Sequence, residues 1–225
     1  MFAGNAGLAH LVERDLAKVE VASSSLVTRS TKAFRHWRKA FLLQKGRIFV
    51  AQLETKRTIL RPFRTNDLSD VFAFCSEPEI ENVGWERHRS IAETKTVLEN
   101  WIKNPNFFAI EEKASGKVIG YLHVQNDSED GLPDVKELGF ALYSTYHRRG
   151  LMSEILPTVL NWLFSHGIQS VWACCFQNNL SCKGLIEKSG FRFMQEGSFY
   201  SVSRKENIAS FEYRMTKEEW KTRIQ

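Results

Sequence analysis

The 225-residue sequence lacks the features that mark several classes of protein. No apolar run approaches the about 20 residues that span a bilayer, which excludes a transmembrane helix and predicts no membrane partner. The four cysteines form no C-x-x-C pair and have no histidines at matching spacing, and the neighbours Cys174 and Cys175 point to opposite faces of a strand. We therefore expect reduced thiols, no bound metal and a cytoplasmic location.

The sequence also lacks a surplus of basic residues outside its first quarter. Residues 1–56 contain ten Lys or Arg and four Asp or Glu, whereas the rest of the chain contains 21 basic and 22 acidic residues. A near-neutral body gives no electrostatic reason to bind nucleic acid, so we expect no nucleic-acid partner for it.

The basic first quarter has no sustained hydrophobic period. Within it, residues 31–49 are compatible with a basic amphipathic helix that binds a membrane surface or targets an organelle. Alternatively, the codons for residues 22–27 can be written as a stem-loop that resembles the T-arm of a transfer-RNA gene, which favours a native start near Val50 or Leu53. We predict a poorly ordered extension over residues 1–52 and one folded domain over residues 53–222.

Hydrophobic periodicity divides this domain into strands and helices. Period-2 patterns predict strands at residues 58–63, 107–112, 117–125, 135–142, 170–176, 191–200 and 209–215. Helical spacing with caps predicts helices at residues 67–75, 90–104, about 150–165 and 181–190. The order indicates an α+β fold in which a mixed, mostly antiparallel sheet is flanked by helices.

A polar stretch with Arg148, Arg149 and Gly150 separates the 135–142 strand from the helix that follows. One interpretation is a solvated turn whose arginines face water. The other is a phosphate site, because a helix N-terminus presents free N–H groups and a partial positive charge to an anion. Gly150 allows the backbone to approach a ligand closely.

Four stretches of the body resemble the GNAT superfamily of acetyl-CoA-dependent N-acetyltransferases, and within it the ribosomal-protein N-terminal alanine/serine acetyltransferases. They are TILRPFRTNDLSDVFAFCSEPEI, KVIGYLHV, ELGFALYSTYHRRGLMSE and NNLSCKGLIEKSGFRFMQEG, and the resemblance covers about Leu53 to Trp220. It implies a three-layer α/β/α fold with a splayed sheet, and acetyl-CoA bound as co-substrate where two strands part. Family loops read Arg/Gln-x-x-Gly-x-Gly/Ala; this chain departs from that pattern at His147 and Met152.

The resemblance assigns expected roles to individual residues. Glu137 is the predicted general base, directly or through water, and Ser181 the predicted proton donor to the leaving thiolate. A backbone N–H near Phe140 or Leu142 is expected to polarise the thioester carbonyl. The predicted cofactor-binding residues are Phe140, Leu142, Arg148, Arg149, Gly150, Leu151, Met152, Ser153 and Asn178.

Each assignment has a structural alternative. Glu137 can be a rim carboxylate, Asn178 a turn cap, and Ser181 simply the N-cap of its helix, a position that favours serine. Trp85 and Arg87, which follow the first helix, are predicted to line the cleft for the acceptor, although a surface loop is an equally good interpretation.

The predicted function is N-acetyl transfer to a primary amine, on a protein N-terminus or a small molecule, by a monomer or homodimer. An α-amine with a pKa near 7.8 is about 15% neutral at pH 7, whereas a lysine-like amine is only about 0.05% neutral. An N-terminal acceptor therefore demands little of a base. The alternative is a non-catalytic acyl-CoA-binding or interaction module on the same fold.

Overall fold

The computed structural model describes residues 52–126, 132–201 and 204–224. The prediction for residues 1–52 therefore falls, except at Gln52, outside the described residues. The strands are β1 (Leu53–Glu54), β2 (Thr58–Pro62), β3 (Phe107–Glu112), β4 (Val118–Asn126), β5 (Val135–Leu142), β6 (Ser170–Phe176), β7 (Arg192–Ser201) and β8 (Glu206–Thr216). The helices are α2 (Leu68–Cys75), α3 (Ile91–Lys103), α4 (Leu151–Ser165), α5 (Leu180–Lys188) and α6 (Lys217–Ile224), with short 3-10 turns η1 (Thr65–Asp67), η2 (Pro78–Val83) and η3 (Ser144–Tyr146).

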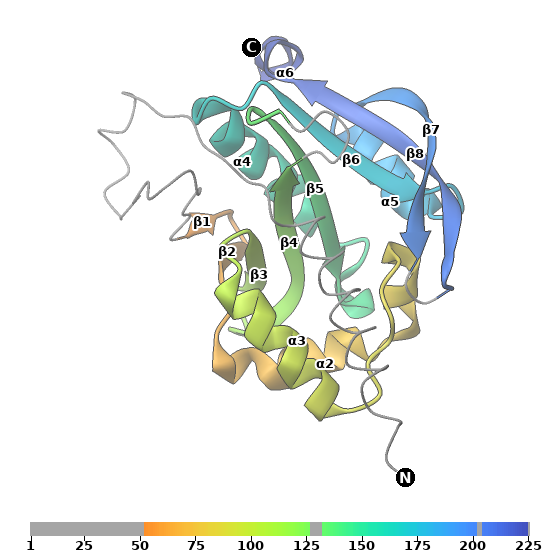
Figure 1. The fold of residues 1–225 in the computed structure, drawn as a ribbon. Coiled ribbons are helices and arrows are strands. Elements are labelled where there is room, and N and C mark those ends of the chain that lie inside the picture. The colour runs from red at the N-terminus through yellow and green to blue at the C-terminus, as the bar shows by residue number, and fades with distance from the viewer. Residues whose placement is uncertain (1–51, 127–131, 202–203, 225) are drawn as a thin grey trace.

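The strands form one sheet in the order β1-β2-β3-β4-β5-β6-β8-β7. Every neighbouring pair is antiparallel except β5 and β6, which run parallel. Helices α2 and α3 cover one face of the sheet, and α4 and α5 cover the other (Figure 1). The predicted α+β class, with a mixed and mostly antiparallel sheet, is confirmed. The short elements β1 and α6 were not predicted.

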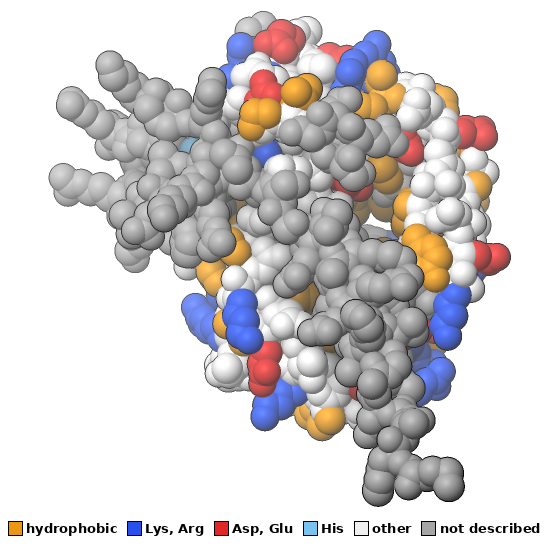
Figure 2. All heavy atoms as spheres, viewed as in Figure 1, with side chains coloured by type: hydrophobic (Ala, Val, Ile, Leu, Met, Phe, Trp, Pro, Cys, Tyr) orange, Lys and Arg blue, Asp and Glu red, His pale blue; other side chains and the backbone are white. Residues whose placement is uncertain are grey.

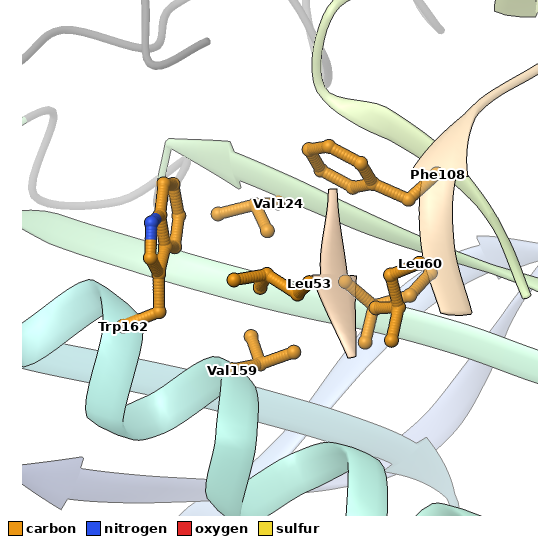
Figure 3. A pocket seen from close by; sticks show the side chains of 7 residues that line it. Leu53, Leu60, Phe108, Val124, Val159 and Trp162 are labelled. Carbon is orange, nitrogen blue, oxygen red and sulfur yellow. The ribbon is translucent and has the colours of Figure 1, made fainter. Parts of the chain in front are cut away.

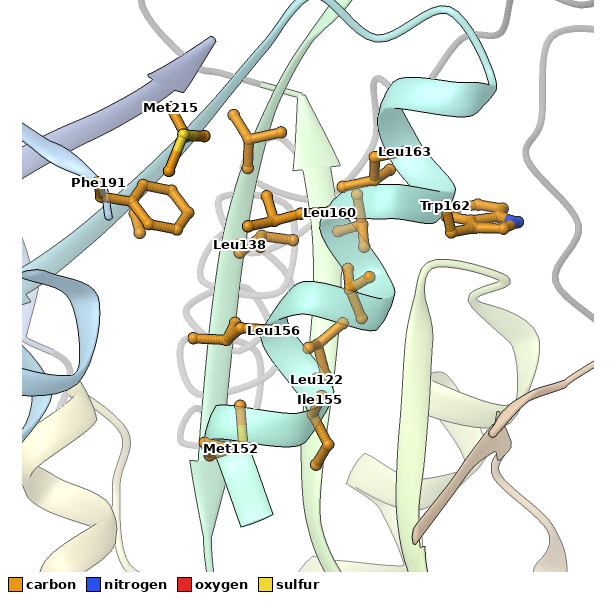
Figure 4. Packing of buried hydrophobic residues seen from close by; sticks show 14 of the residues in the cluster. Leu122, Leu138, Met152, Ile155, Leu156, Leu160, Trp162, Leu163, Phe191 and Met215 are labelled. Carbon is orange, nitrogen blue, oxygen red and sulfur yellow. The ribbon is translucent and has the colours of Figure 1, made fainter. Parts of the chain in front are cut away.

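Helix α4 packs its apolar side against the sheet and forms the larger core with it (Figure 4). Leu156 and Leu160 on the helix are fully buried against Leu122 on β4 and Leu138 on β5. Burying a leucine side chain contributes about 1.5–3 kcal/mol. This packing fixes the N-terminus of α4 relative to the end of β5.

A second core lies on the opposite face, beneath α2 and α3. Val71, Phe74 and Leu98 are buried there beside Trp101, and Tyr121 of β4 contributes the sheet side of the cluster. Each face of β4 therefore packs against a different layer of helices, because successive side chains of a strand point to opposite faces.

A buried ion pair joins β2 to the segment that leads into α2. The Arg61 guanidinium donates two hydrogen bonds of 2.8 Å to the two carboxylate oxygens of Asp67, and both side chains are about 5% exposed. Asp67 also accepts from the Arg64 N–H at 2.7 Å. Removing one partner of such a pair leaves a buried charge unpaired, which costs about 3–5 kcal/mol.

A small cavity lies between β1, the sheet and α4 (Figure 3). Its volume is about 10 Å³, and apolar side chains, including those of Leu53, Leu60, Val159 and Trp162, surround it. The space suits about one water molecule, and its apolar walls offer little to hold one. This cavity is a packing gap, and the groups capable of chemistry lie elsewhere.

Candidate active site

The sheet opens between its two parallel strands. Residues 135–138 of β5 pair with residues 170–173 of β6, and the ladder stops at Leu138 and Ala173. Beyond that point β5 pairs only with β4, and β6 pairs only with β8. Figure 1 shows the two strands diverging. The splayed sheet is therefore present, and its opening begins after Leu138.

The free edge of β5 presents backbone groups to this opening. The Tyr143 N–H donates to the Ile119 carbonyl on the β4 side at 2.8 Å. Backbone groups along a strand alternate in direction, so those of Leu142 and Phe140 face the opposite edge, which β6 has left. An imidazole nitrogen of His147 lies 2.8 Å from the Leu142 carbonyl oxygen. The N–H groups of Phe140 and Leu142 thus point toward the gap, where the sequence predicted a carbonyl-polarising donor.

In the loop between β5 and α4, the sign of the backbone φ angle alternates from residue to residue. Arg148 and Gly150 have positive φ values of 57° and 73°, and Arg149 between them does not. This alternation turns successive N–H groups toward a common point, as in anion-binding nests. Gly150 is the N-cap of α4 and provides no side-chain cap, so the first N–H groups of the helix remain available. The loop has the form of a phosphate site.

The two loop arginines differ in their freedom to bind a ligand. The Arg149 guanidinium donates to Glu112 at 2.9 Å and lies 4.8 Å from the centre of the Tyr146 ring. Arg148 is exposed, and no ion pair joins it to any residue that the structure describes. Arg148 is therefore the freer cation, whereas Arg149 also ties the loop to the β3–β4 hairpin.

A third arginine at this loop was missed by sequence reasoning. The Arg57 Nε donates to the Glu154 carboxylate on the first turns of α4 at 2.7 Å. Its guanidinium also approaches the position where Gly150 would carry a side chain, at 3.5 Å. The pair spans 97 residues of sequence, and no local pattern signals it.

Comparison with known proteins identifies the chemistry that this geometry serves. The family model "Acetyltransferase (GNAT) domain" matches residues 57–192, more than half of the chain. The chain belongs to the GNAT acetyltransferase family. It is an N-acetyltransferase, and the GNAT fold binds acetyl-CoA as co-substrate.

Three similar proteins illustrate the relationship. A Bacillus subtilis protein named uncharacterized N-acetyltransferase YoaA is 26% identical over 147 residues, which are 62% of this chain and 82% of the relative. A GCN5-related N-acetyltransferase from Brucella melitensis superposes with a TM-score of 0.66 at 23% identity, covering 76% of this chain and 80% of that one. A putative ribosomal-protein-serine acetyltransferase from Vibrio cholerae gives a TM-score of 0.61 at 17% identity, covering 73% and 97%.

The GNAT assignment fits the residues at the opening. Coenzyme A carries a pyrophosphate, and the available N–H groups at residues 151–153 together with Arg148 are the donors that a pyrophosphate requires. Leu151 and Met152 are buried, whereas Ser153 is exposed. The bulky Met152, which departs from the usual family pattern, therefore packs into the core and leaves its backbone N–H for the loop.

Helix α5 begins one residue earlier than Ser181 and has a different cap. The Asn179 side chain accepts a hydrogen bond from the Cys182 N–H at 3.1 Å, so Asn179 is the N-cap, and the interpretation of Ser181 as the N-cap was wrong. An amide oxygen takes this role as readily as a hydroxyl. Ser181 is exposed in the first turn, and Asn178 is exposed just before the helix. Both stay candidates for the cofactor, because neither makes a hydrogen bond that fixes its side chain within the described ranges.

Glu137 lies on the face of β5 that is turned away from α4. Its carboxylate accepts a hydrogen bond of 3.0 Å from the Gln125 amide on β4. Two residues further along β5, Gly139 lies against the His123 imidazole, and a side chain at this glycine would clash with Nε2. Burial lowers the pKa of His123 to about 4, so this ring is neutral near pH 7. This face of the sheet thus combines one carboxylate with one neutral imidazole.

Aromatic rings form the wall next to this polar group. The Trp85 ring stacks on Tyr121 with centroids 5.1 Å apart and meets Trp101 at 5.3 Å, and His123 stacks on Phe107 at 4.9 Å. Trp85 is therefore half-buried on the same face as Glu137, while Arg87 is exposed on the surface. The fold brings only Trp85 of these two predicted residues into the packed wall.

The surface around this face carries charges of both signs. Lys and Arg side chains are interspersed with Asp and Glu side chains around its rim (Figure 2). No group of three or more His, Cys, Asp or Glu among residues 52–126, 132–201 and 204–224 is arranged to hold a metal ion. No helix in those ranges is long and apolar enough to cross a bilayer.

Proposed function

We propose that this GNAT protein transfers the acetyl group of acetyl-CoA directly to a primary amine, with the α-amino group of a protein N-terminus as the first substrate class to test. The observation that carries the proposal is the parting of β5 from β6 immediately after Leu138 and Ala173, next to the loop at Gly150. An opening of this kind admits a thioester between the strands. The name of the similar Vibrio cholerae protein, a putative ribosomal-protein-serine acetyltransferase, supports a protein as the acceptor.

The proposed chemistry uses groups of β5 and of α5, the elements at the two edges of the opening. The neutral amine nitrogen attacks the thioester carbonyl carbon, the C–N bond forms, and the C–S bond breaks to release coenzyme A as a thiolate. In the proposal, N–H groups of Phe140 and Leu142 stabilise the oxyanion. Glu137 removes the amine proton, directly or through a water, and Ser181 donates a proton to the thiolate and regains one from solvent.

The cofactor half of the proposal is tested by calorimetry on the full chain. Acetyl-CoA is titrated into the wild type and into Arg148→Ala, Arg148→Glu and Arg87→Ala variants. Loss of a charge-assisted hydrogen bond removes about 1.5–3 kcal/mol, so Arg148→Ala should weaken binding about tenfold or more. Arg87, an exposed arginine predicted for the acceptor and not for the cofactor, is the matched control and should leave the affinity for acetyl-CoA unchanged. Absence of heat with the wild type would contradict the proposal.

The acceptor half is tested by thiol release from acetyl-CoA across a panel of amines. The panel contains peptides with free Ala or Ser N-termini, the same peptides with blocked N-termini and an internal lysine, polyamines and free amino acids. Faster release with free than with blocked N-termini supports the proposed class. Binding of acetyl-CoA without release for any member would favour the acyl-CoA-binding module instead.

A further inference from the structure

Two side chains from neighbouring strands lie beside the Glu137 carboxylate. The Gln125 amide of β4 donates a hydrogen bond to it at 3.0 Å, and Cys174 of β6, on the same face of the sheet, places an S–H group next to it. Burial and the carboxylates of Glu137 and Glu212 raise the pKa of Cys174. This thiol therefore stays protonated near neutral pH and remains a donor.

Strand register explains why these two residues reach the same carboxylate. Gln125 stands directly opposite Glu137 in the antiparallel ladder. Trp172 is the partner of Glu137 in the parallel ladder, and Cys174 lies two residues further along β6 on the same face, just past the last pair at Ala173. Cys174 is thus placed on the same side of the sheet as Glu137, at the point where the two strands begin to part.

We propose that Gln125 and Cys174 are positioning residues that hold the Glu137 carboxylate toward the acceptor amine. This proposal rests on the proposed function, in which Glu137 is the general base. Both donors favour the ionised carboxylate, the form that accepts a proton. They also restrict its rotation, and a base must lie within hydrogen-bond reach of the proton that it removes.

Other charged groups near Glu137 would influence the same titration. His123 faces this region from β4, and Glu212 of β8 lies opposite Cys174. Arg214 of β8 lies over the ring of Trp172, the register partner of Glu137. These groups stay unchanged in the variants below, so differences between variants report on the two donors.

The test compares Cys174→Ala, Cys174→Ser and Gln125→Leu in the full-length enzyme with the amine that the panel identifies. Cys174→Ala and Gln125→Leu should each lower kcat about tenfold while leaving the KM for acetyl-CoA unchanged. Cys174→Ser keeps an O–H donor and should restore most of kcat. A packing role predicts similar losses of kcat for Cys174→Ala and Cys174→Ser, because both variants remove the sulfur atom.

The matched control is Gln52→Leu, which removes an equivalent amide donor, 2.7 Å from Glu54, next to β1 at the edge of the sheet. It should leave kcat unchanged. Without their donor, Cys174→Ala and Gln125→Leu should also move the acid limb of the kcat/KM profile to higher pH, because the charged carboxylate is less favoured. Thermal melting checks that each variant is folded, and Gln125→Leu carries the test if Cys174→Ala does not fold.

Glu137→Gln separates the two proposals. If Glu137→Gln keeps wild-type kcat, Glu137 is not the base, and the positioning roles of Gln125 and Cys174 are overturned with it. If Glu137→Gln is inactive while Cys174→Ala and Gln125→Leu keep wild-type kcat and pH profile, the positioning proposal alone is overturned and the proposed function stands.

Discussion

The two faces of β5 carry different kinds of side chain and have different surroundings. Leu138, Phe140 and Leu142 point toward α4 and belong to its apolar core. Glu137 and Gly139, which alternate with them, face the opposite side of the sheet beside an amide, a thiol and an imidazole. A strand with a side-chain period of two can therefore fix its own position with one set of residues and present reactive groups with the other.

This difference between the two faces predicts which substitutions alter stability and which alter activity. On the α4 face the apolar side chains are closely packed against many neighbours, so a change is expected to alter stability. On the other face, few polar groups each depend on one or two partners, so a change is expected to alter activity. Four predictions test this contrast, from the largest expected effect to the smallest.

Leu160→Ala should remove stability without a specific effect on the site. Leu160 is fully buried on the α4 face, and its truncation leaves a cavity that lowers the free energy of unfolding by about 2–5 kcal/mol. Urea denaturation measures the loss, and Leu160→Met should cost less than about 1.5 kcal/mol. A fall in kcat with unchanged stability would contradict the expected difference between the two faces of β5.

Acid should destabilise the protein through His123. Burial lowers the pKa of His123 to about 4 from an ordinary value of 6.5, so between these values the unfolded chain binds the proton more tightly. This contribution to stability is complete above pH 6.5 and is lost as the pH falls toward 4, by about 3 kcal/mol in total. In His123→Gln the free energy of unfolding should therefore change by about 3 kcal/mol less over this pH range. His88 and His166, whose pKa values are also lowered, are present in both proteins and cancel in the difference.

Gly139→Ala should destabilise the protein through a single unfavourable contact. The new methyl group overlaps His123 Nε2, and the strain should lower the free energy of unfolding by about 1–3 kcal/mol. Because the imidazole causes the clash, adding His123→Ala should recover part of the loss. Additive effects in this double-mutant cycle would show that the two sites do not interact.

Gly184→Ala supplies the opposite control and the smallest effect. Gly184 lies inside α5, and a methyl group there would meet no atom within 4 Å. The substitution should stabilise the protein by about 0.5–1 kcal/mol, because alanine favours the helix. Thermal melting measures the change, and a loss of stability would contradict the open position of this residue.

Several parts of this fold followed from local pattern. The strands at residues 107–112, 135–142 and 170–176 have the predicted bounds, because each is a compact apolar or alternating run between polar breaks. The N-cap of α5 was missed, because Asn179 and Ser181 are both good capping residues and spacing alone does not choose between them. Helix α6 was missed because its side chains are mostly polar and only Trp220 is buried.

The sequence by itself determined the alternation of β5, the strand–loop–helix order and the cations of the loop, since all of these depend on near neighbours in the chain. Only the tertiary structure decided which arginine is free, because Arg149 is paired across 37 residues with Glu112, and Arg57 across 97 with Glu154. It also decided which donors reach Glu137, because strand register, set by the packing of the whole sheet, places Gln125 and Cys174 beside it. Local sequence specifies the direction of a side chain, whereas its partners depend on how distant elements pack.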